Sequence, residues 1–211
     1  MQYERNGTIV RTTQPVRQLT KVTKVVTVDS RDRDPTKFIK VPGGPTSSDP
    51  GDYVVYLPRV YENVVSIRLR SAIIAAPETT GFTSNYLLLS LEGLNKMDET
   101  ATGSKRSGYV DNAFAKISNP NMADPASVTQ PTFTIFYNDK VDEENITRYT
   151  PPIGRLERFH ISFYYHPSTA GTNASVPITF GSSENALTFE IEYLDNSFTD
   201  FSSFETRLSA V

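Results

Sequence analysis

The chain has 211 residues, of which 37% are apolar and 21% are charged, and its formal net charge is −3. This length fits one all-β domain, and the composition excludes extended disorder and a helical membrane bundle. Cysteine is absent, which excludes disulfide scaffolds, thiolate zinc sites, iron–sulfur clusters and thiol nucleophiles. We expect no cofactor and no metal, because the two histidines, His160 and His166, are too few for a histidine-rich centre.

Residue types that suit a pleated, half-buried surface are abundant, including 12 Phe and 11 Tyr. The 14 Pro and 11 Gly residues are spread along the chain, as expected where many strands need many turns. No apolar stretch approaches the roughly 18 residues of a membrane-spanning helix. Met1 to Arg5 lack the layout of a secretory signal. We therefore expect an all-β protein that is made and used without crossing the secretory pathway and without membrane insertion.

Residues 1–30 are basic although the chain as a whole is acidic. Glu4 and Asp29 oppose five cationic residues, namely Arg5, Arg11, Arg17, Lys21 and Lys24. The segment is predicted to be an extended N-terminal arm that ends in a strand, and deleting residues 1–28 is expected to leave the domain folded. A frayed terminus without a role is the alternative. Direct contact with nucleic acid is not expected, because spaced basic residues without aromatic partners make a weak footprint.

The next segment, residues 29–35, alternates positive and negative charge and stops at Pro35. It is not a calcium loop, because Arg31 and Arg33 occupy ligand positions and the required glycine is missing. A short strand is predicted at residues 38–41. The Pro- and Gly-rich segment at residues 42–51 is predicted to be a loop.

Period-two alternation of apolar and polar residues predicts the core strands that follow. The expected core faces are Tyr53, Val55 and Leu57; Val65, Ile67, Leu69 and Ile73; Phe133, Ile135 and Tyr137; Phe159, Ile161, Phe163 and Tyr165; and Leu187, Phe189, Ile191 and Tyr193. Residues 86–91 (YLLLSL) are apolar on both faces, which indicates a strand covered on both sides. Long polar connections separate the strands at residues 93–111 and 118–130.

About eight strands with long end loops predict a single jelly-roll antiparallel β-sandwich, which we place at residues 31–197. Residues 198–211 form a C-terminal tail. Its apolar residues recur at a spacing of three to four, typical of a short helix: Phe198, Phe201, Phe204 and Leu208. The tail is expected to pack on its own domain, with a neighbouring molecule as the alternative.

Motifs for catalysis are mostly missing. There is no phosphate-binding loop, since residues 103–108 have neither its spacing nor the flanking strand and helix, and no G-x-S-x-G elbow. His160 and His166 lie on the polar face of one predicted strand, where we expect them to be solvated. Two acids on distant strands would suffice for a glycosidase, but the acidic run at residues 142–144 is expected to be a solvated turn. We therefore predict that the chain is not an enzyme.

Several segments follow one another in a recognisable order: DSRDRD at 29–34, YVVYLP at 53–58, VVSIRLRSAII at 64–74, YLLLSLEGL at 86–94, NAFAKI at 112–117, LTFEIEYL at 187–194 and SSFETRL at 202–208. In this order the chain resembles the small single-jelly-roll capsid proteins of nucleocytoplasmic large DNA viruses, particularly those of the chlorella-virus type. The resemblance spans roughly residues 29–208, and none of its motifs is catalytic.

The resemblance implies a structural role in a large icosahedral virion assembled in the host cytoplasm, where a chain without cysteine suits the reducing environment. It favours the penton, a homopentamer at each five-fold vertex, with the major capsid protein and other minor capsid proteins as partners. A minor capsid protein beneath the shell is the alternative. A closed ring needs a head-to-tail interface, for which the candidate residues are Arg31, Arg33, Arg68 and Arg70. Solvation, or pairing within the chain, is the competing interpretation for each of these arginines.

A jelly-roll module that binds glycans is a further alternative, because loop residues with amide and carboxylate groups can bind sugars. The residues in question are Asn119, Asn121, Asp124 and Asp139. Fold alone does not decide between a shell protein, a glycan-binding module and a hydrolase.

Overall fold

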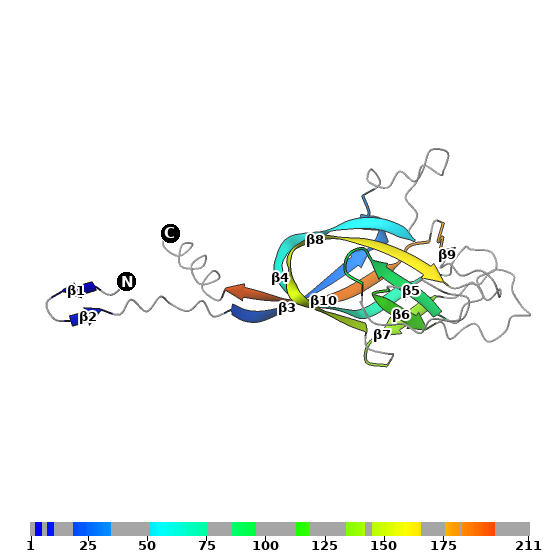
Figure 1. Cartoon of the computed structure of the whole chain (residues 1–211). Helices are drawn as coiled ribbons and strands as arrows, with labels where there is room; N and C mark the ends of the chain where they lie inside the picture. Colours follow the sequence, from blue (N-terminus) through cyan, green and yellow to red (C-terminus); the bar gives the residue numbers. More distant parts are fainter. Residues whose placement is uncertain are drawn as a thin grey trace, which may run out of the picture.

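The computed structural model describes residues 3–5, 8–10, 19–34, 51–75, 86–95, 113–118, 134–141, 145–165, 176–181 and 183–196. This part of the chain is almost entirely β, which confirms the predicted all-β class (Figure 1). The strands are β1 (Tyr3–Arg5), β2 (Thr8–Val10), β3 (Leu19–Asp29), β4 (Asp52–Ile74), β5 (Tyr86–Leu91), β6 (Ala115–Ser118), β7 (Ile135–Asn138), β8 (Asn145–Tyr165), β9 (Val176–Pro177) and β10 (Ala186–Asn196). A turn of 3₁₀ helix, η1 (Ser30–Asp32), follows β3.

Two long bent strands, β4 and β8, organise the sheet. They pair antiparallel with each other along both of their halves, and the register shifts between Tyr56 and Tyr61 and again between Val64 and Ser66. Pro58 lies in the first irregular stretch, and Asn63 adopts a left-handed backbone with φ 53°, a conformation that Asn tolerates better than most residues. Figure 1 shows both strands curving at the same end of the molecule. One sheet is thereby folded into two layers.

The first layer consists of β3, β10, residues 64–74 of β4, and residues 145–153 of β8 together with β7. The second layer consists of residues 52–57 of β4, residues 156–165 of β8, β5 and β6, with the short β9 paired to β8. Without the short β7 and β9, the layers contain eight segments, which are, in chain order, β3, the two halves of β4, β5, β6, the two halves of β8, and β10. When these segments are numbered from 1 to 8, the strand order is 1-8-3-6 in the first layer and 2-7-4-5 in the second. This is the order of a jelly roll, in agreement with the prediction.

Aromatic side chains fill the interior between the layers. The ring of Phe189, from β10 in the first layer, lies 4.9 Å from that of Phe159, from β8 in the second, and 6.0 Å from that of Phe114 beside β6. Phe163 and Phe180 meet edge to face at 5.3 Å. All five rings are fully buried. Such contacts between tilted rings stabilise the core beyond the apolar area that they bury.

Most of the predicted core faces are buried, including those of β10 and the second half of β8. In β4 the pattern differs, because Val65 and Arg70 are extra residues relative to β10 and form two β-bulges. Each bulge shifts the alternation by one residue. The buried apolar residues of this part are Val64, Ile67, Leu69, Ala72 and Ile74. The prediction for Ile73 was therefore wrong, since its side chain is 51% exposed, and Val65 is only half-buried.

The predicted N-terminal arm ends in a full strand of the sandwich. β3 pairs with β10 along its whole length of 11 residues, and Val26 and Val28 belong to the core. Residues 19–28 are therefore structural, and the expectation that residues 1–28 can be removed does not fit this arrangement. Phe133, His166, the short strand predicted at residues 38–41 and the tail at residues 198–211 lie outside the described residues.

Candidate functional site

Arg68 and Arg70, two of the predicted interface residues, lie on the outer face of the first layer and pair within the chain. Nη2 of Arg68 is 2.7 Å and Nε of Arg70 is 3.1 Å from Oδ2 of Asp139, and Nη1 of Arg70 is 2.7 Å from Oε2 of Glu190. Asp139 follows β7, where the chain leaves the edge of β4, and its side chain is only 1% exposed. Two cations and two anions thus neutralise one another at this face.

Arg33 also pairs within the chain. Its Nη1 donates to Oε2 of Glu184 and to the backbone oxygen of Ser30, both at 2.7 Å. Burial raises the pKa of Glu184, but hydrogen bonds from Ser30 and Arg33 outweigh burial and hold that pKa below its usual value. The fully buried Ser30 joins this pair to the core, because its Oγ accepts a 2.9 Å hydrogen bond from the backbone N–H of Asn185.

Arg31 is the fourth predicted interface residue, and it is exposed at the surface of η1. Its backbone N–H donates to Oδ1 of the neighbouring Asp29 at 2.9 Å, which caps the helical turn. The structure therefore brings the four arginines to two separate places, near η1 and on the first layer. Their role in a subunit interface stays a prediction, and Arg31 has the most accessible side chain for it.

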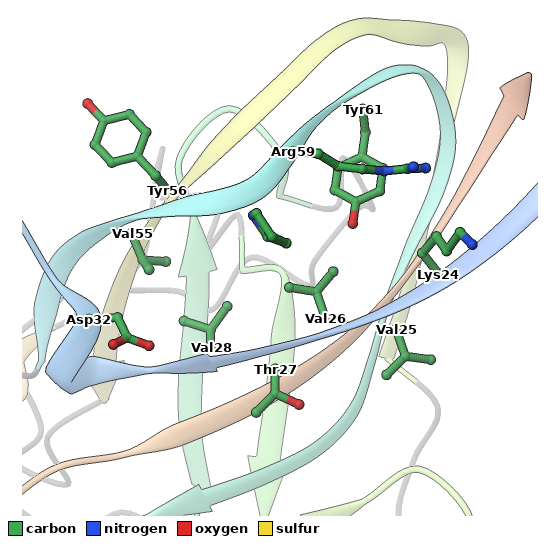
Figure 2. Close-up of a pocket in the computed structure, with 11 residues that line it drawn as sticks. Lys24, Val25, Val26, Thr27, Val28, Asp32, Val55, Tyr56, Arg59 and Tyr61 are labelled. Atoms are coloured by element: carbon green, nitrogen blue, oxygen red, sulfur yellow. The ribbon is translucent and has the colours of Figure 1, made fainter. Parts of the chain in front are cut away.

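A groove of about 560 Å³ lies between β3 and the first half of β4 (Figure 2). Among the described residues, β3 is an edge strand of the first layer and residues 52–57 form an edge of the second, where the Asp34 N–H donates to the Val54 oxygen. As far as the described residues go, the sandwich is therefore open on this side. Sheet edges of this kind are places where another chain can pair.

Three buried core valines form the floor of the groove, and two exposed cations lie at one end. Val26 and Val28 point from β3 toward β4, and Val55 points back toward them (Figure 2). The exposed Lys24 and Arg59 lie at one end. The guanidinium of Arg59 stacks over the rings of Tyr61 and Tyr193, at 4.9 and 5.1 Å from their centroids, and also donates to the Tyr193 hydroxyl. Asp32 is the acid among the lining residues.

His160 differs from the solvated histidine that the sequence predicted. Its Nε2 lies 2.8 Å from Oδ1 of Asp52 and its Nδ1 lies 2.6 Å from Oε2 of Glu92. These contacts connect β8 to β4 and to the turn after β5. The hydrogen bond to Asp52 is the largest influence on the pKa of His160 and raises it above its ordinary value, against the opposing effect of burial.

This cluster is not arranged as a nucleophilic triad. Ser162 donates its hydroxyl proton to Oδ1 of Asp52 at 3.0 Å, the same atom that faces His160. A serine nucleophile needs a histidine as its base, and here the carboxylate lies between the two groups. The described residues also contain no group of three or more His, Asp or Glu residues placed to hold a metal ion. The arrangement is that of a cross-strand contact.

No protein-family model matches the chain, and no curated protein matches it either. Within the part of the chain that the structure describes, no helix has the length and hydropathy needed to cross a membrane.

Proposed function

We propose that the chain is a structural subunit of a large icosahedral double-stranded DNA virus capsid, specifically the penton at the five-fold vertex. The observation that carries this proposal is the jelly-roll strand order combined with one open side between β3 and β4. A shell subunit needs a rigid sandwich and a surface left for neighbours. The continuous aromatic core supplies the first, and the groove with its two sheet edges supplies the second.

A ring of five requires two different surfaces on each subunit that fit each other, with a rotation that closes. The groove side is our candidate for one of these surfaces, and the exposed Arg31 near it for a charged contact at the rim. In this proposal the protein acts by self-assembly and by contacts with the major capsid protein and minor capsid proteins. It uses no cofactor and performs no catalysis.

The glycan-binding alternative receives less support from the geometry. Asp139, one of its candidate ligands, is buried and already contacts Arg68 and Arg70. A carboxylate held in this way is not available to accept hydrogen bonds from a sugar. The other candidates, Asn119, Asn121 and Asp124, lie outside the described residues.

Light scattering on the purified, tag-free protein over a range of concentrations tests the proposal. A closed penton predicts a particle with five times the chain mass of 23.5 kDa, whose mass does not grow further with concentration. Arg31→Glu should lower the fraction of this particle. Lys140→Glu, an exposed charge reversal beside β7, should not lower it.

Other closed masses, such as a trimer, would contradict the vertex assignment. A monomer at all concentrations leads to a second measurement, cosedimentation with purified capsid shells that lack their vertices. Failure to fill those vertices would overturn the proposal.

A further inference from the structure

We draw no further inference here: the strongest candidate, the exposed apolar pair that Ile73 and Phe136 form on the outer face of the first layer where β4 pairs with β7, carries nothing because nothing in the structure shows what covers it.

Discussion

Two regions of the molecule handle charge in opposite ways. On the outer face of the first layer, Arg68 and Arg70 contact Asp139, which lies almost entirely out of solvent. On the open side, the groove has Lys24 at its end, and the described residues provide no ion pair for it. The first arrangement stabilises one chain, since removing one partner leaves buried charge uncompensated. The second leaves an exposed cation at the end of a groove, where it is available to another molecule.

The same difference separates two of the predicted interface arginines. Arg33 is tied to Glu184 and to the backbone of Ser30, whereas Arg31 is exposed on the same short helical turn. Arg33 thus stabilises the fold, whereas Arg31, two residues earlier, is left at the surface. We expect substitutions in the paired region to change the free energy of unfolding and substitutions on the open side to change assembly.

The largest effect is expected from removing the wall of the groove. A chain without residues 1–28 loses nearly all of β3, including Val26 and Val28, and should not unfold cooperatively, because the whole domain has only about 5–15 kcal/mol of stability to lose. A chain without residues 1–18 keeps β3 and should melt within about 4 °C of the intact protein. Thermal melts followed by circular dichroism compare the two. A cooperative, unshifted melt of the shorter chain would show that β3 contributes little to the sandwich.

Asp139→Asn breaks the paired region while preserving side-chain shape. The guanidinium groups of Arg68 and Arg70 then lie side by side without their shared anion, and the free energy of unfolding should fall by about 2–3 kcal/mol. The matched control is Glu157→Gln, which removes the exposed Arg155–Glu157 pair and should change it by less than about 1 kcal/mol. Urea unfolding measures both variants. Equal losses of unfolding free energy in the two variants would mean that a buried carboxylate stabilises the protein no more through its ion pairs than an exposed one.

His160 predicts a smaller and pH-dependent effect. The pKa of His160 is raised in the folded protein. The contacts of the protonated ring with Asp52 and Glu92 therefore contribute their full stabilisation of the fold at pH values below the ordinary pKa of 6.5. This contribution is lost as the pH rises through the folded-state pKa. The free energy of unfolding should therefore fall by about 1 kcal/mol as the pH rises above 6.5, a modest value because the Glu92 side chain is 77% exposed.

His160→Gln should remove this pH dependence, and Glu92→Gln should reduce it only in part. Urea unfolding at several pH values checks both variants. A stability that rises with pH in this range in the intact protein, and not in His160→Gln, would contradict the raised pKa.

The sequence predicted the fold class because its strongest signal, period-two alternation, depends on each strand alone. It predicted the core faces of β10 and the second half of β8 correctly. It could not predict the face of β4 at Val65 or beyond Leu69, because the bulges at Val65 and Arg70 exist only in the register with β10. Ile73 became exposed for this reason, although nothing in its neighbouring residues differs from a regular strand.

The candidate sites depended even more on pairing between distant segments. Arg70, Asp139 and Glu190 meet because β7 and β10 lie on opposite edges of β4, which no local pattern reveals. The partners of His160 likewise come from distant segments, Asp52 from β4 and Glu92 from the turn after β5. The groove results from the position of two sheet edges in different layers, and the sequence signal available for it was the mixture of valines and lysines in β3.

The smallest effect on stability is expected on the open side. Lys24 is exposed and belongs to an edge strand, so Lys24→Glu should change the free energy of unfolding by no more than about 0.5 kcal/mol in urea unfolding. Asp139→Asn changes the charge by one unit and Lys24→Glu by two, yet Asp139→Asn should cost several times more, because the partners of Asp139 are fixed within the chain. A loss in Lys24→Glu as large as that in Asp139→Asn would mean that the groove cation stabilises the monomer. If the free energy of unfolding falls only slightly, Lys24 does not stabilise the monomer and can act instead on self-association. In that respect the open side differs from the face with the paired arginines.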